Sequence, residues 1–183
     1  MELALIRHTR CDVAEGTCYG HLDVPLAGSA VADIELTLSR VPPVDLVFSS
    51  PSRRCHALAQ ALANRDACEL RVRDDLRELH FGSWEGLRWS DIPRTLSDAW
   101  AEDPWNNAPP NGESENQLWQ RAAHVAEELR QLEATMRVAV VSHGGPLRHL
   151  RCLLTGSPAS ERWRWSSACG EVTLIAARVL TAS

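Results

Sequence analysis

Short apolar segments that alternate with amphipathic ones constrain this chain more than any other feature. The runs Glu2–Ile6, Asp45–Phe48 and Arg137–Val141 are long enough for buried strands and too short for helices. Helical spacing of apolar residues fills the intervals between them, most clearly over Glu113–Glu133. Strands that alternate with helices predict an α/β fold around a mainly parallel sheet.

Weaker signals complete the predicted order of elements. Ala27–Arg40 has helical spacing and stops before two prolines, and a run of serines supplies capping chemistry for a helix that extends to about Asn64. Glu69–Val72 predicts a further strand, and Gly170–Val179 predicts the last one. Pro146 suits the first position of a helix that follows the strand at Arg137–Val141.

A chain of 183 residues with 44% hydrophobic residues suits a single domain, 1–183, with one core. The periodic pattern lapses between Gly82 and Gly112, where four tryptophans and four prolines occur. We interpret about residues 83–112 as an inserted cap or lid, since long segments with weak periodicity usually serve function. A core role for its tryptophans is favoured over a platform for a flat, aromatic ligand.

Composition excludes several classes of protein. A net charge of -5 argues against a nucleic-acid partner. No apolar stretch reaches the roughly 20 residues of a membrane-spanning helix, and the first residues do not resemble an export signal, so we expect a cytoplasmic protein without a membrane partner. The six cysteines have no metal-finger spacing and predict reduced thiols.

All 19 basic residues are arginine. Any anion site in this chain must therefore use arginine, histidine and backbone N–H groups.

Polar side chains stand where the predicted strands end. Arg7 and His8 follow the first strand, Arg54 follows the second, Glu78 follows Glu69–Val72, and His143 follows Arg137–Val141. Ligands of open α/β sheets bind outside the carboxyl ends of the strands. We therefore expect these five side chains to gather at one edge of the sheet.

This set of residue types suits a phosphate monoester. A phosphoryl group carries a charge of roughly -1.5 to -2 at neutral pH, and arginines and helix N-termini bind such anions. A neutral imidazole can attack phosphorus, and a carboxylic acid can protonate the leaving oxygen. This chemistry requires no metal and no cofactor.

Each residue also has a structural interpretation. Arg7-His8 is a weak signal by itself, and His143 and Glu78 taken singly are ordinary turn and surface residues. The second such pair, Arg148-His149, lies in a predicted helix and is interpreted as a solvated face. The remaining histidines, His21 and His80 among them, are also assigned structural or surface roles.

The motifs together resemble the histidine phosphatase superfamily, whose fold is phosphoglycerate mutase-like. The blocks are ALIRHTR, VFSSPSRRCHALAQAL, LRELHFGSWEG, NGES and VAVVSHGGPLR, and they occur in the order of that family over nearly the whole chain. The resemblance implies a three-layer α/β/α sandwich. It also implies that His8 is the phosphorylated nucleophile, that Glu78 is the proton donor and acceptor, and that Arg7, Arg54 and His143 hold the phosphoryl oxygens.

Within this superfamily, RHTRCDVAEGTCYGHLDVPLA is similar to the α-ribazole phosphatases of cobalamin assembly. That similarity implies hydrolysis of α-ribazole 5′-phosphate, with Arg10, Tyr19 and Gly144 as further candidate contacts to the substrate. Many relatives carry glutamate or glutamine at the position of Arg10 and asparagine at the position of Ala14, so this chain departs from their pattern at both.

Three alternatives stay open on sequence grounds. They are a phosphatase of broad specificity for small molecules, a phosphoglycerate mutase-like enzyme, and a non-catalytic phospho-ligand-binding protein. The expected partner in each case is a small-molecule phosphate ester, and a homodimer is compatible with the sequence.

Overall fold

The computed structural model describes residues 1–176, which form five strands, five α-helices and four short 3₁₀ helices. The strands are β1 (Glu2–Arg7), β2 (Leu46–Ser49), β3 (Glu69–Val72), β4 (Arg137–Ser142) and β5 (Val172–Ala176). The α-helices are α1 (Ala30–Leu38), α2 (Arg53–Asp66), α3 (Arg94–Glu102), α4 (Glu115–Arg130) and α5 (Gly144–Thr155). The 3₁₀ helices are η1 (Asp74–Leu76), η2 (Gly82–Trp84), η3 (Trp89–Asp91) and η4 (Ala159–Arg164).

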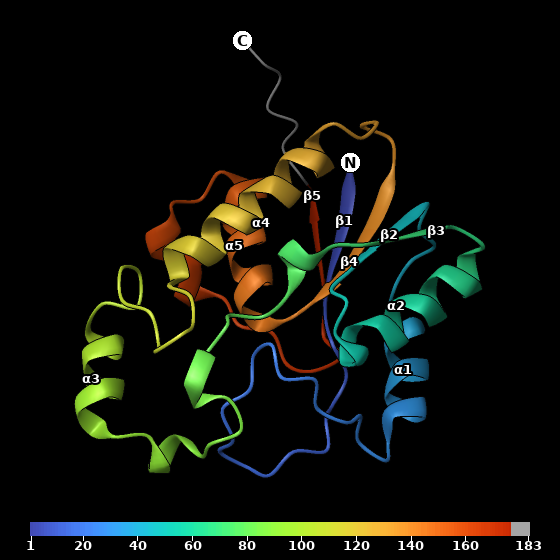
Figure 1. Ribbon diagram of the computed structural model, residues 1–183. Helices are drawn as coiled ribbons and strands as arrows, with labels where there is room; N and C mark the ends of the chain where they lie inside the picture. The colour runs from blue at the N-terminus through green and yellow to red at the C-terminus, as the bar shows by residue number, and fades with distance from the viewer. Residues whose placement is uncertain (177–183) are drawn as a thin grey trace.

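The five strands form one sheet in the order β3-β2-β4-β1-β5. Four of them are parallel, and β5 pairs antiparallel with β1 at the edge. Every predicted strand is therefore present, although residues 177–179 of the predicted last strand lie outside the described residues. The carboxyl ends of the parallel strands all point toward the cap that carries α3 (Figure 1).

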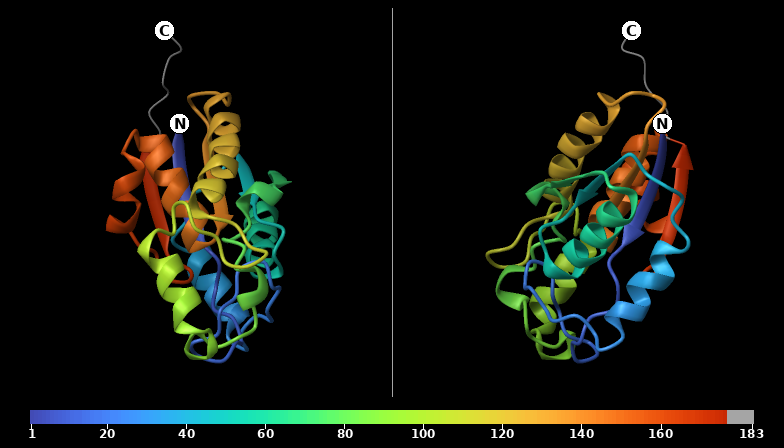
Figure 2. Two further views of the ribbon diagram at one scale, coloured as in Figure 1. Left: turned by 60° about the vertical axis from the view of Figure 1, so that its left-hand side comes forward. Right: turned by 90° about the vertical axis from the view of Figure 1, so that its right-hand side faces the viewer.

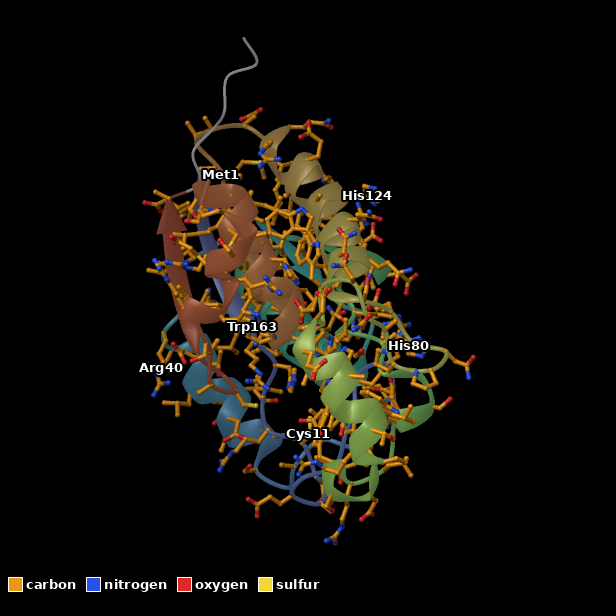
Figure 3. All side chains as sticks on the ribbon, turned by 90° about the vertical axis from the view of Figure 1, so that its left-hand side faces the viewer. Met1, Cys11, Arg40, His80, His124 and Trp163 are labelled. Atoms are coloured by element: carbon orange, nitrogen blue, oxygen red, sulfur yellow. The ribbon has the colours of Figure 1, made fainter. Side chains whose placement is uncertain are left out.

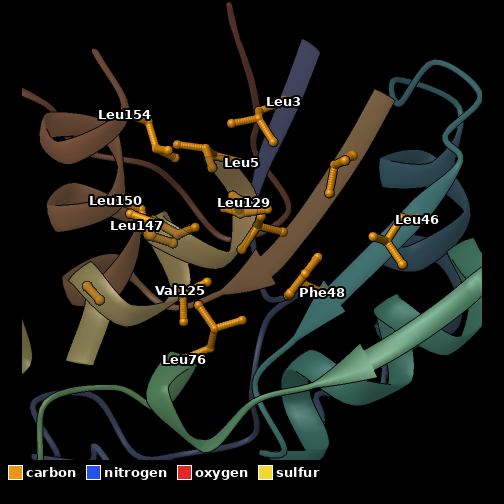
Figure 4. Packing of buried hydrophobic residues seen from close by; sticks show 14 residues of the cluster. Leu3, Leu5, Leu46, Phe48, Leu76, Val125, Leu129, Leu147, Leu150 and Leu154 are labelled. Carbon is orange, nitrogen blue, oxygen red and sulfur yellow. The ribbon is translucent and has the colours of Figure 1, made fainter. Parts of the chain in front are cut away.

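One face of the sheet packs against α4 and α5. The largest buried cluster joins leucines and valines of β1, β2 and β4 to apolar residues of those two helices (Figure 4). In α4 these residues recur at Ala122, Val125, Ala126 and Leu129, which is the helical spacing seen in the sequence.

The other face of the sheet packs against α1 and α2. Ala4, Ile6 and Val47 contact a row of α2 residues that includes Leu58 and Leu62, with side chains of α1 at the margin. Because strand residues alternate between faces, each buried strand supplies both clusters. Helices on both sides of the sheet confirm the predicted three-layer α/β/α sandwich (Figure 2).

The helix after β4 begins two residues earlier than predicted. It starts at Gly144 rather than at Pro146, because the backbone of His143 is extended and its carbonyl accepts the first helical hydrogen bond, from Leu147 N at 3.1 Å. The other predicted helix ends shift by two or three residues. Helix α4 begins at Glu115 because Ser114 and Gln117 form a reciprocal capping box.

The segment predicted as a cap contains η2, η3 and α3. It packs on the loop after β1 through backbone hydrogen bonds that join Gly16 and Cys18 to residues 86–89. Trp84 is buried with Cys18 and Ile92, and Trp100 packs against this cluster. Trp84 and Trp100 therefore pack inside the cap as the sequence favoured, whereas Trp89 remains 38% exposed.

Candidate active site

The sheet register places the two key histidines side by side. Arg7, the last residue of β1, pairs with Ser142, the last residue of β4. The next residue on each strand is a histidine, and the amide of His8 donates to the Ser142 carbonyl at 2.9 Å. The rings of His8 and His143 stand edge to face with centroids 5.2 Å apart.

The imidazole of His8 is held in one tautomer. Its Nδ1 lies 2.7 Å from the carbonyl oxygen of Thr9, which can only accept, so Nδ1 carries the proton and Nε2 carries a lone pair. Burial lowers the pKa of His8 from 6.5 to about 3, and the charges of Arg54 and Arg7 act in the same direction. His8 is therefore a neutral imidazole with a free nucleophilic nitrogen at physiological pH.

Arg54 is fully buried in the first turn of α2. Its guanidinium donates to the carbonyl oxygens of Gly20 at 2.6 Å and Leu22 at 3.0 Å, and its Nε donates to Nδ1 of His143 at 3.2 Å. All three acceptors are neutral. The positive charge of Arg54 therefore lacks a carboxylate among these partners, which suits it to bind a substrate anion.

His143 is buried and engaged at both ring nitrogens. Its Nδ1 accepts from Arg54, so Nε2 carries the proton and donates to the hydroxyl of Ser50 at 2.9 Å. Burial, followed by the charge of Arg54, lowers the pKa of His143 well below its ordinary value. In this structure His143 orients Arg54, and its predicted contact to the phosphoryl group stays a prediction.

Arg7 presents its guanidinium to the N-terminus of α5. It donates to the carbonyl of Ser167 at 2.7 Å, while its buried Nε has no partner among the described residues. A Cβ on Gly144 would lie 3.8 Å from the Arg7 Cζ. A side chain at position 144 would therefore touch this guanidinium in the first turn of the helix.

Glu78 lies on the loop after η1 and faces the same helix end. Its Oε1 accepts from the amide of Leu79 at 2.9 Å and from the amide of Gly145 at 3.1 Å. A side chain at position 145 would collide with this carboxylate, because a Cβ there would stand 2.3 Å from Oε1. Gly145 therefore allows the carboxylate to lie directly on the backbone of α5.

A residue that sequence reasoning missed fixes the loop that carries Glu78. Arg121 of α4 donates to the carbonyl oxygens of Asp75, Arg77 and Glu78 at 2.7–2.9 Å, and pairs with the carboxylate of Glu113. A single arginine on an amphipathic helix carries no signal of this role, since its acceptors are backbone atoms far away in the sequence.

Tyr19 and Arg10, which the sequence suggested as further contacts to the substrate, lie in different surroundings. The ring of Tyr19 stacks on Arg54 at 5.3 Å, and burial raises the pKa of its hydroxyl. The guanidinium of Arg10 is instead bound by both oxygens of Asp33, at 3.0 and 2.7 Å, and its side chain is 64% exposed. Its charge is thus compensated by α1, and Ala14 lies on the exposed surface.

The prediction that Arg148-His149 forms a solvated face is wrong. His149 is fully buried, and its Nε2 lies 2.7 Å from a carboxylate oxygen of Glu115, which Arg162 also contacts at 3.3 Å. The side of α5 that carries His149 packs against α4 and η4, so the pair is covered by elements that the local pattern does not reveal.

Two further findings concern metal-binding clusters and membrane-spanning helices. Within residues 1–176, no group of three or more His, Cys, Asp or Glu side chains is placed to hold a metal ion. In the same part of the chain, no helix is long and apolar enough to cross a membrane. The loops after β1 and β3, marked by Cys11 and His80, are visible in Figure 3.

Known proteins resemble this chain in sequence and in structure. The family model "Histidine phosphatase superfamily (branch 1)" matches residues 3–178. Adenosylcobalamin/alpha-ribazole phosphatase of Escherichia coli K12 is 30% identical over 173 residues, covering 90% of this chain and 84% of that protein. Phosphoserine phosphatase 1 of Hydrogenobacter thermophilus is 27% identical over 169 residues, covering 89% and 80%.

A solved structure gives the same result for the fold. The crystal structure of the alpha-ribazole phosphatase from Shigella flexneri superposes with a TM-score of 0.86 at 25% identity, covering 95% of this chain and 89% of that one.

Proposed function

Because the chain belongs to the histidine phosphatase superfamily, we propose that it is a phosphomonoesterase that hydrolyses α-ribazole 5′-phosphate through a phosphohistidine at His8. The observation that carries this proposal is the state of His8. Its buried, neutral ring donates from Nδ1 to the Thr9 carbonyl and leaves the lone pair of Nε2 available. A nucleophilic imidazole needs this arrangement.

In the first step, Nε2 of His8 attacks phosphorus and the ester P–O bond breaks. Glu78, in its protonated form, gives its proton to the leaving oxygen, so the alcohol departs neutral. Arg7, Arg54 and the amide of Gly144 at the start of α5 stabilise the charge on the three non-bridging oxygens.

In the second step, water attacks phosphorus and the P–N bond breaks. Glu78, now a carboxylate, accepts a proton from that water, which regenerates His8 and releases inorganic phosphate. The amides of Leu79 and Gly145 keep the carboxyl group in one place through both steps.

The choice of α-ribazole 5′-phosphate rests on the relatives and on the segment after His8. Relatives of similar identity carry different names, since Phosphoserine phosphatase 1 is matched nearly as well as the Escherichia coli protein. A broad-specificity phosphatase of small phosphate esters is therefore the second candidate. A purely phosphate-binding protein is the candidate from another class.

Two measurements test the proposal. Wild-type protein should hydrolyse p-nitrophenyl phosphate with EDTA present, and His8→Ala should lose this activity because the nucleophile is absent. Phosphate binding without turnover would instead support the binding protein. The substrate is tested by comparing kcat/KM for α-ribazole 5′-phosphate, 3-phosphoglycerate, phosphoserine and a nucleoside monophosphate, and similar values for all four would support the broad-specificity enzyme.

A further inference from the structure

Arg148 lies beside the candidate active site rather than in solvent. Its guanidinium approaches the N-terminus of α5, where its NH1 atom would be 3.7 Å from a Cβ on Gly144. The Cζ atom of Arg7 lies 3.8 Å from the same point. Two guanidinium groups thus converge on one glycine at a helix N-terminus, where the backbone N–H of Gly144 also favours an anion.

The donors of these two arginines are incompletely used. The Nε atoms of Arg7 and of Arg148 are both buried and both lack a hydrogen-bond partner among the described residues. Neighbouring Arg162 differs, because its Nε contacts the carboxylate of Glu115 at 3.3 Å. Unpaired buried donors on adjacent cations are costly unless a ligand satisfies them.

Trp163 of η4 holds Arg148 in this position. The Arg148 Cζ stands over its indole ring, 4.3 Å from the centroid, which is a close cation–π contact. Burial lowers the pKa of Arg148, and the carboxylates of Glu78 and Glu115 oppose that effect. The guanidinium is therefore partly stripped of water and remains charged on the side of the site where Glu78 lies.

We propose that Arg148 is a third arginine ligand of the substrate phosphoryl group, acting with Arg7 across Gly144, and that Trp163 is its positioning residue. This inference rests on the proposed function for the identity of the substrate anion. It assigns the free donors of Arg148 to the non-bridging phosphoryl oxygens on the side of Glu78, the candidate acid. An arginine there would stabilise the charge that develops as the ester bond breaks.

The test measures binding of inorganic phosphate by isothermal titration calorimetry, which needs no turnover. Arg148→Ala should bind phosphate about 10- to 100-fold more weakly, as expected for a lost charge-assisted hydrogen bond. Arg164→Ala is the matched control, since Arg164 is 77% exposed and, among residues 1–176, pairs only with Glu161, at 3.0 Å. Its phosphate affinity should equal that of the wild type.

Rescue separates a ligand from a structural residue. Millimolar guanidinium should restore part of the phosphate affinity of Arg148→Ala, and Trp163→Phe should retain more affinity than Trp163→Ala. If Arg148→Ala unfolds, Arg148→Met is used in its place, because methionine keeps an unbranched side chain against Trp163 and removes the charge. Wild-type affinity in the folded charge-free variant would overturn the proposal.

The two proposals fail in different ways. A wild-type protein without phosphatase activity, in which Arg148→Ala still weakens phosphate binding, would refute the proposed function and leave this subsite standing. An active enzyme whose phosphate affinity is indifferent to Arg148 would refute the subsite alone.

Discussion

Replacing Gly145 with alanine tests the geometry that holds the candidate acid. The new methyl carbon would stand 2.3 Å from Oε1 of Glu78 and 3.0 Å from Cδ2 of Leu118. Both are closer than ordinary contacts allow, and Gly145 lies in the first turn of α5 with its backbone fixed by the helix. The carboxylate, as the end of a flexible side chain, must therefore move.

The displaced carboxylate loses the amide of Gly145, which donates to it at 3.1 Å. A hydrogen bond to a charged group contributes about 1.5–3 kcal/mol. If that positioning is lost in the transition state, kcat for an alkyl phosphate falls about 10- to 100-fold. Hydrolysis of p-nitrophenyl phosphate should fall only a few-fold, because its leaving group needs little protonation.

The assay compares steady-state kcat for glycerol phosphate and p-nitrophenyl phosphate in wild type and Gly145→Ala. Gly28→Ala is the control, since a Cβ at Gly28 meets no atom within 4 Å. Thermal unfolding checks that the variant is folded. Equal losses on both substrates, or none on the alkyl ester, would refute the positioning of Glu78 by Gly145.

Three other predictions concern His8, Glu115 and Glu78. The pKa of His8 is about 3 in the folded protein and 6.5 in the unfolded chain, so between these pH values only the unfolded chain binds the proton. The free energy of unfolding should therefore fall as the pH drops from 6.5 to 3. The fall should be smaller in His8→Asn, which lacks this group. Urea unfolding at pH 7.5 and 4.5 measures this, and parallel pH profiles would contradict it. Glu115→Ala should lower the free energy of unfolding by about 3–5 kcal/mol, because it leaves Arg162 buried beside His149 without a carboxylate; a urea midpoint equal to that of the wild type would rule this out. Glu78→Gln should slow alkyl phosphates far more than p-nitrophenyl phosphate, and equal slowing measured in parallel assays would point to a different acid.

The strands were predictable because each is a short apolar run between polar ones. Segment Glu69–Val72 has the predicted bounds despite its charges. Strands β1 and β4 each extend one residue beyond the predicted end, and β2 is shifted by one residue at both ends. Once parallel strands alternate with helices, their carboxyl ends share one edge. This rule explains why Arg7, His8, Arg54, Glu78 and His143 meet in the structure as expected.

Contacts between distant segments were not predictable. Arg121 binds backbone carbonyls of the loop that carries Glu78, and backbone acceptors leave no trace in the residue types of a sequence. The sequence pattern predicted an exposed His149, because its partner Glu115 lies on another helix and cannot be identified from the residues around position 149. The orientation of His143 depends on Arg54 and Ser50, which come from different elements. A local pattern identifies such residues without revealing which atoms they contact.

The hydrogen bonds between residues 16–18 and residues 86–89 have a consequence for protein engineering. Replacing the cap, about residues 83–112, with that of a relative would leave backbone N–H and C=O groups of the loop after β1 without their hydrogen-bond partners. The same loop supplies the carbonyls of Gly20 and Leu22 that hold Arg54. A chimaera that transplants both segments together is therefore the one expected to keep the hydrogen bonds that hold Arg54.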